Sequence, residues 1–246
     1  MKISPNLKTS LNGEHVVTHY DTRVTTGKGT RTELVYGALR ADLMNATFPP
    51  GTRLKLAALV ERFGVSQSVV REALTRLSEQ GLVIAEPQRG FRVRPLTRED
   101  LADLTKVRVH LECLALRESM ARGDVSWESD VVSSHYRLER LNMVDENGLL
   151  DEEWTRVHAE FHHSLVSACG SDRLLAIVGG LRENSDVYRQ WSWSLAQDYN
   201  RGNVAEHRNL MDLALARKTE EAVEALKAHI ERAANALMKF LDSPAE

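Results

Sequence analysis

The alternation of apolar and polar positions along the chain predicts a mostly helical protein with one short hairpin. The clearest helix lies in GVSQSVVREALTRLSEQG, residues 64–81. Its apolar residues repeat with the helical period and form one face, made of Val70, Ala73, Leu74 and Leu77. Ser66 has the position of an N-cap, and Val65 and Val70 have the spacing of a hydrophobic staple. Gly81 is suited to the position just beyond the helix end.

The opposite face of this helix begins with short or forked polar side chains, namely Ser66, Gln67, Ser68, Arg71 and Thr75. The turn at Gly64 and Val65 precedes them directly. This arrangement is typical of the recognition helix of a helix-turn-helix, which contacts DNA near its N-terminus. An amphipathic surface helix would show the same pattern, so the flanking chain has to decide.

Two further helices are predicted before this one. Residues 31–45 have an apolar helical face with Thr32 as its cap, and Pro49, Pro50 and Gly51 end that pattern. A short helix follows in KLAALVERF, immediately before Gly64. The helix at 64–81 is therefore the third of a group.

A hairpin is predicted after the third helix. Residues 82–85 and 91–93 are β-type runs, and EPQRG between them is suited to a turn. Three helices followed by a hairpin make a winged helix, over residues 31–95. Arg89, Arg92 and Arg94 are expected to make the wing positive, and Arg89 with Gly90 at the tip is the expected DNA contact.

The chain from residue 96 to 242 predicts an all-α bundle. Thr97 is the expected cap of its first helix, which runs to about Arg122. The other predicted helices are 127–143, 150–168, 172–196, 204–217 and 219–241. The fold class is mainly α, an N-terminal winged helix-turn-helix followed by a helical bundle large enough to bury its own core. Residues 1–30 have no sustained period and are expected to form an N-terminal arm.

Composition restricts the functional classes. The chain has 246 residues, of which 42% are hydrophobic and 27% charged, as in soluble globular proteins. No apolar run has the length of a membrane span and no signal peptide is evident. Cys113 and Cys169 lack metal-type pairing and are expected as reduced thiols in the cytoplasm.

Charge divides unequally along the chain. Residues 1–95 carry 14 Lys and Arg against 8 Asp and Glu, whereas residues 96–246 carry 18 against 27. A basic front half and an acidic back half predict that the front half binds a polyanion, here double-stranded DNA.

The order of elements resembles the GntR superfamily of bacterial transcription regulators. LAALVERFGVSQSVVREALTRLSEQGLV and PQRGFRV carry the resemblance in the winged helix. VRVHLECLALR, HAEFHHSLVSACGSDRLL and AEHRNLMDLALARKTEEAVEALKAHI resemble the FCD ligand-binding domain of the FadR-type subfamily. The family's Glu-Arg pair in the second helix is replaced by Leu56 and Ala57, and its Arg-Thr in the recognition helix by Gln67 and Ser68. These departures imply a different operator sequence.

Four histidines of the back half are candidate metal ligands. His158 and His162 are four residues apart, so both can reach one metal from one helix face, and His207 and His229 lie on two other helices. A single histidine on a helix is more often a surface or core residue. His163 points about 100° away from His162 and is not expected to bind the metal.

The resemblance implies how these histidines act together. FCD domains often bind a divalent metal through an Asp-x-x-Phe-His motif and two later histidines, which Phe161, His162, His207 and His229 match. His158 stands where the family has Asp or Asn, and whether it coordinates stays open. If it does, imidazole favours zinc, or nickel as the alternative, over manganese.

The resemblance also implies a small-molecule effector. Arg108 in RVHLE matches an arginine that lines the family's effector pocket, and a guanidinium suits a carboxylate. An ion pair with Glu112 is the alternative. Tyr188 and Trp191, with Trp193 and Tyr199 nearby, are candidate pocket walls that would favour an aromatic or heterocyclic acid. Core packing or a dimer interface would use the same aromatic residues.

These features predict a homodimeric, metabolite-responsive transcription regulator, specifically a repressor that binds a palindromic operator. We find no HExxH motif or nucleophile elbow, which argues against an enzyme. The alternatives are a metal-dependent enzyme fused to a DNA-binding domain, and an architectural DNA-binding protein with a structural metal.

Overall fold

The structure, a computed structural model, describes residues 29–44, 47–146, 150–195 and 203–241. In α7, the side chains of residues 191–195 are also outside the described part. The expected N-terminal arm, Tyr199 and the side chains of Trp191 and Trp193 therefore lie outside the described residues.

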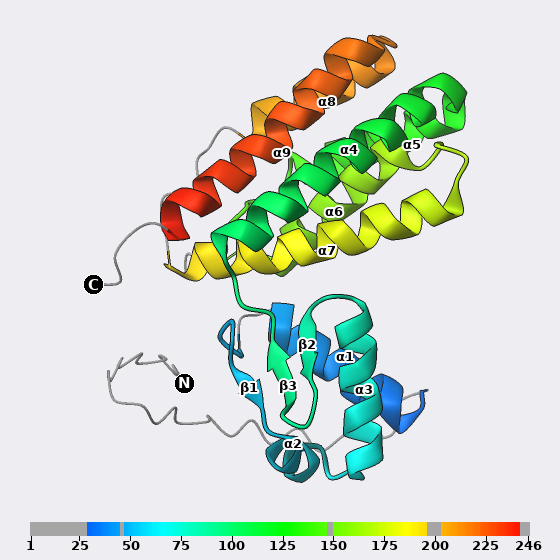
Figure 1. Cartoon of the computed structure of the whole chain (residues 1–246). Helices are drawn as coiled ribbons and strands as arrows, with labels where there is room; N and C mark the ends of the chain where they lie inside the picture. Colours follow the sequence, from blue (N-terminus) through cyan, green and yellow to red (C-terminus); the bar gives the residue numbers. More distant parts are fainter. Residues whose placement is uncertain (1–28, 45–46, 147–149, 196–202, 242–246) are drawn as a thin grey trace.

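The first part of the chain folds as a winged helix (Figure 1). Its helices are α1 (Arg31–Met44), α2 (Leu56–Phe63) and α3 (Gln67–Glu79), and its strands are β1 (Arg53–Leu54), β2 (Val83–Glu86) and β3 (Gly90–Val93). The strands form an antiparallel sheet in the order β1-β3-β2. The sequence pattern missed β1, because a two-residue strand is too short to show a period of two.

Two predicted helix caps were wrong in detail. Ser66 has the extended backbone of an N-cap, but its hydroxyl bonds the hydroxyl of Ser68 at 2.8 Å and makes no capping bond. The first helix is capped by Thr30 rather than Thr32, since the Thr30 hydroxyl and the Glu33 carboxylate each accept the other residue's N–H. This reciprocal pair is a capping box, which starts the helix at Arg31.

The second part of the chain is a helical bundle. Its helices are α4 (Arg98–Arg122), α5 (Val125–Leu138), α6 (Glu152–Val166), α7 (Asp172–Leu195), α8 (Asn203–Leu215) and α9 (Thr219–Leu241). Thr97 caps α4 as predicted, accepting the N–H of Asp100. The predicted helix to residue 143 is too long, because the chain leaves α5 at Leu138 and forms a bridge between Val144 and Leu150.

Each part has its own apolar core. The bundle core centres on fully buried side chains such as Leu116, Phe161, Leu165 and Leu226. The core of the winged helix contains all four residues of the predicted apolar face of α3 and takes in Val187 from α7. Cys113 and Cys169 are buried free thiols. Within the described residues, no helix has the length and apolarity that crossing a membrane requires.

Candidate metal centre and nucleic-acid interface

Four buried histidines meet inside the bundle. His158 and His162 come from α6, His207 from α8 and His229 from α9. One nitrogen of each ring lies within 4.8 Å of those of the other three. His163, next in sequence to His162, is exposed and lies outside this group. Helix packing therefore brings together all four predicted ligands from three separate helices.

Two ring nitrogens of this histidine cluster are buried without a hydrogen-bond partner among the described residues. They are Nδ1 of His162 and Nε2 of His207. Buried polar atoms are normally satisfied, so a ring nitrogen without a partner, such as Nε2 of His207, fits a metal ion. The donor set itself, four imidazoles, suits zinc.

The environment keeps the imidazoles neutral, which is the form that binds metal. Burial lowers the pKa of His158, His162 and His207 well below the usual value, and neighbouring positive charges act in the same direction. After burial, the charge that lowers the pKa most is Arg189 for His158 and Arg182 for His162.

Glu206 fixes the orientation of His229. Nδ1 of His229 donates to the Glu206 carboxylate at 2.8 Å, so Nε2 of the same ring carries a free lone pair. Burial lowers the pKa of His229, and the hydrogen bond to Glu206 opposes this effect. A carboxylate behind a histidine is the usual second partner of a metal ligand.

Arg189 acts on His158 in the opposite way. Its guanidinium lies 3.2 Å from Nδ1 of His158, and because a guanidinium can only donate, Nδ1 must accept. Nε2 of His158 then carries the proton and donates to Nε2 of His162 at 3.1 Å. Binding a metal through Nε2 would move this proton to Nδ1, where Arg189 has no acceptor to offer. Arg189 and a metal would therefore compete at His158.

A small cavity adjoins the histidine cluster. It is lined by side chains of α4, α6, α7 and α9, and Arg108 is one of them. Arg108 donates to the Glu112 carboxylate at 2.8 Å and to the Ser185 hydroxyl at 2.7 Å. It therefore forms the ion pair considered as the alternative and also lines the cavity. Arg182 also pairs with the fully buried Glu112, and its Nε has no hydrogen-bond partner among the described residues. The cavity thus offers a guanidinium N–H to an anion.

Tyr188 does not reach this cavity. It is buried beside Leu101, Ala234 and Leu237, and its hydroxyl donates to Asp100. On α7 it lies three residues beyond Ser185, but it turns toward the start of α4. Trp191 follows on the same helix, where its side chain is outside the described residues.

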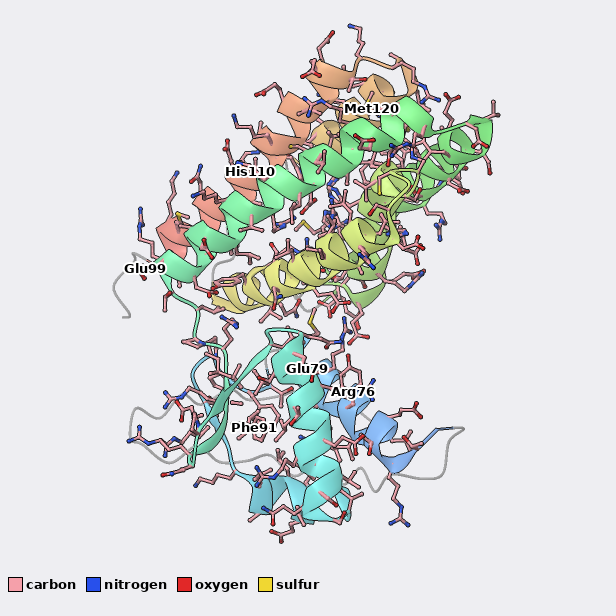
Figure 2. The ribbon with its side chains drawn as sticks, turned by 45° about the vertical axis from the view of Figure 1, so that its right-hand side comes forward. Arg76, Glu79, Phe91, Glu99, His110 and Met120 are labelled. Carbon is pink, nitrogen blue, oxygen red and sulfur yellow. The ribbon has the colours of Figure 1, made fainter. Side chains whose placement is uncertain are left out.

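The predicted DNA-contact residues are exposed on α3 and the wing, apart from the half-buried Gly90. Ser66, Gln67, Ser68, Arg71 and Thr75 are exposed at and beyond the start of α3, and Arg89 is exposed in the turn between β2 and β3. Gly90 has a φ of +90°, a backbone conformation that favours glycine at the wing tip. Figure 2 shows Arg76 and Glu79 at the opposite end of α3, toward the bundle.

The wing is less basic than the sequence predicts. Arg92 pairs with Glu86 at 2.9 Å, and Arg53 of β1 lies 3.7 Å from the same carboxylate. Arg94 turns inward and binds the carbonyl of Gly81 and the carboxylate of Asp100. Arg89 therefore remains as the wing-tip cation, and Arg94 is structural.

The sequence matches the bacterial regulatory proteins of the gntR family over residues 31–93 and the FCD domain over residues 103–232. The chain belongs to the gntR family. A regulator of Paraburkholderia xenovorans, "Uncharacterized HTH-type transcriptional regulator BphR", is 38% identical over 85% of both chains. The Escherichia coli "HTH-type transcriptional repressor GlaR" is 29% identical over 79% of this chain and 90% of that protein.

A solved structure supports the same assignment. It is a putative transcriptional regulator GntR from Rhodococcus sp. RHA1, with a TM-score of 0.65 and 26% identity, covering 87% of this chain and 99% of that one. This gntR-family protein is a DNA-binding transcription regulator, and it is not an enzyme.

Sequence reasoning missed several residues around the centre of this regulator. Glu206, Arg182, Ser185 and Arg189 contact the histidines or line the cavity, but none stands in a distinctive motif. The available signal was the spacing of Arg182, Ser185 and Arg189. It shows that the three side chains share one face of a helix, but not which other helix that face contacts.

Proposed function

We propose that the protein is a cytoplasmic, homodimeric repressor whose bundle binds zinc and a small carboxylate effector. The observation that carries the proposal is the meeting of four buried, neutral imidazoles, each with one nitrogen within 4.8 Å of those of the other three. Four nitrogen ligands favour zinc, with nickel as the alternative, over the oxygen-preferring manganese. His158 belongs to the ligand set together with His162, His207 and His229.

The residues beside the zinc site support a carboxylate. Arg108 and Arg182 share one acid, Glu112, so the guanidinium charge is not fully balanced there. A carboxylate would bind the zinc or these N–H groups, and Arg108 would orient it. Tyr188 does not line the cavity, so it no longer supports an aromatic or heterocyclic acid as the effector. That preference would rest on Trp191 alone.

Two winged helices would bind a palindromic operator. Gln67, Ser68 and Arg71 would contact base edges or phosphates in the major groove, with Ser66 and Thr75 beside them, and Arg89 with Gly90 would contact DNA through the wing. Regulators of this family usually act as dimers, and the relative GlaR is described as a repressor.

The zinc site is tested by elemental analysis and native mass spectrometry. We expect one zinc per chain in the wild type, no stoichiometric zinc in His207→Ala or His229→Ala, and weakened binding in His158→Ala. His163→Ala is the matched control, because its side chain is exposed and adjacent in sequence. Full zinc content in both His207→Ala and His229→Ala would refute the site.

DNA recognition is tested with an operator selected from random duplexes. Binding should weaken steeply with salt, since phosphate contacts release counterions. Arg71→Ala should weaken binding and, if Arg71 contacts a phosphate, lower the salt slope by about one. Binding that does not depend on salt would contradict this docking.

A structural zinc in an architectural DNA-binding protein is the second candidate. Four imidazoles complete a tetrahedral set, as in structural zinc sites. A thermal-shift screen of carboxylates separates the two, because a ligand that binds the native state raises its apparent stability. No shift with any carboxylate, and no small-molecule effect on DNA release, would favour the structural role.

A further inference from the structure

One segment of α7 faces both the cavity and the DNA-binding part. Arg182, Ser185, Asp186 and Arg189 line the cavity and recur at the spacing of one helical face. The residues between them, Glu183, Asn184 and Val187, contact the winged helix instead. Figure 1 shows α7 as the helix of the bundle that lies along the winged helix.

Asn184 contacts the C-terminal end of the recognition helix, whereas Glu183 pairs with Arg40 of α1. Nδ2 of Asn184 donates to the carbonyl of Gln80, the C-cap of α3, at 3.1 Å. Its side chain also lies against Gly81, where a Cβ would come within 3.3 Å of it. Val187 is 9% exposed and belongs to the core of the winged helix. This end of α3 is marked by Glu79 in Figure 2.

A second chain of contacts links the same two places. The hydroxyl of Tyr188 on α7 donates to Asp100, and Asp100 accepts from Arg94 at 3.0 Å. Arg94 in turn donates to the carbonyl of Gly81. The segment 182–189 therefore holds the end of the recognition helix directly through Asn184 and indirectly through Tyr188.

The cavity is too small for an organic ligand as it stands. Its volume is about 40 Å³, whereas one water molecule has a share of about 30 Å³ of the liquid and small-molecule pockets measure about 300–1,000 Å³. A carboxylate effector must therefore displace a wall. Histidines of the zinc site line part of it, on α6 and α9, and would be held by the metal.

The C-terminal half of α7 is the cavity wall that contributes no described side chain to the larger core of the bundle. Among the described residues, the larger buried core of the bundle takes only Val178 from α7, with Leu174 and Leu175 packed against it. These three anchor the first half of the helix. The second half, from Arg182, contacts the cavity and the winged helix, and Tyr188 packs in a smaller cluster beside Leu101, Ala234 and Leu237.

We propose that segment 182–189 of α7 couples the two sites, because filling the cavity displaces it and withdraws Asn184 from the end of the recognition helix and Val187 from the core of the winged helix. Asn184 is thus a positioning residue for α3. This inference rests on the proposed effector site and names the route by which its occupancy reaches the DNA-binding surface.

Because the effector is unidentified, the test fills the cavity with a larger side chain introduced by mutation. Ser185→Phe places a large group in the cavity, while Ser185→Ala removes the same hydroxyl and leaves the space empty. The readout is hydrogen exchange at the amides of Gln80, Gly81 and Leu82, which bond carbonyls of α3. We expect exchange to rise about tenfold in Ser185→Phe, equivalent to about 1.4 kcal/mol, and to stay near wild type in Ser185→Ala.

Ile177→Phe is the control for bulk, since Ile177 is exposed on the same helix. Asn184→Ala with Val187→Ala should raise the same exchange, and adding Ser185→Phe to that pair should raise it no further. A purely structural role would make the effects additive.

Unchanged exchange in a folded Ser185→Phe, or additive effects, would overturn the coupling. If Ser185→Phe does not fold, Ser185→Leu takes its place with the same two outcomes. Zinc stoichiometry of the wild type is measured separately, so that the coupling and the proposed zinc site can fail independently. Normal zinc content in the wild type, together with unchanged hydrogen exchange in Ser185→Phe, refutes the coupling alone.

Discussion

Acid should destabilise the metal-free bundle in a pH range where its carboxylates are still ionised. The perturbation is a fall in pH from about 6 to 5 in the presence of a chelator. His158, His162 and His207 have pKa values well below the usual value of 6.5 because they are buried among positive charges. The unfolded chain therefore binds protons at these three positions before the folded protein does, and stability falls as the pH drops below about 6.5.

The magnitude follows from the number of buried rings. Each histidine that stays neutral in the folded state contributes up to about 1.4 kcal/mol per pH unit, so three give about 4 kcal/mol per pH unit. His229 and His135 act in the same direction with smaller effects, because nearby Glu206 and Glu139 oppose the lowering of their pKa by burial. A loss of this size is comparable to the whole stability of many domains, about 5–15 kcal/mol.

The assay is urea unfolding of the metal-free protein at several pH values. His207→Gln removes one of the three protons, so the slope of unfolding free energy against pH should fall by about 1.4 kcal/mol per pH unit. Val157→Ala is the matched control: Val157 is buried on the same helix as His158, so the substitution costs stability but leaves the slope unchanged. A wild-type slope below about 1.4 kcal/mol per pH unit, the value for one proton, would refute the reasoning.

Three further predictions concern single side chains. Glu206→Gln should weaken zinc binding by about 10- to 100-fold in a chelator competition, since His229 loses its carboxylate partner; unchanged affinity would exclude that role. Arg189→Met should strengthen zinc binding by roughly tenfold, because the competing donor at His158 is removed, and weaker binding would contradict the competition. Thr97→Ala should cost about 1 kcal/mol in urea unfolding and Ser66→Ala only a few tenths, because only Thr97 makes a capping bond; equal costs would contradict the difference.

Much of the fold was predictable because its signals are local. The apolar period of α3, the prolines after α1 and the Thr97 cap each act within a few residues, and so they located helices and the hairpin to within a few positions. Errors occurred where one contact decided the boundary. Thr30 rather than Thr32 caps α1 through its reciprocal bond with Glu33, and β1 exists only because β3 is available to pair with it.

The candidate site divides in the same way. The four histidines were recognisable in the sequence from their spacing and from the motifs of the resemblance. Their partners were not, because Arg189 reaches His158 across 31 positions and Arg182 reaches Glu112 across 70. Side chains this far apart in the chain meet only through helix packing, which no local pattern encodes.

By itself, the sequence determined the element types, the amphipathic recognition helix and the set of imidazoles, since these depend on residue type and short spacing. Only the tertiary structure decided what each side chain does. Arg94, expected as a DNA-facing cation of the wing, binds the carbonyl of Gly81 beyond the recognition helix instead. Tyr188, expected as a pocket wall, donates to Asp100. The tertiary structure also placed Asn184 on Gln80, 104 positions away. The physical reason is that burial and hydrogen bonding depend on which helix faces meet, and those faces are set by the packing of the whole chain.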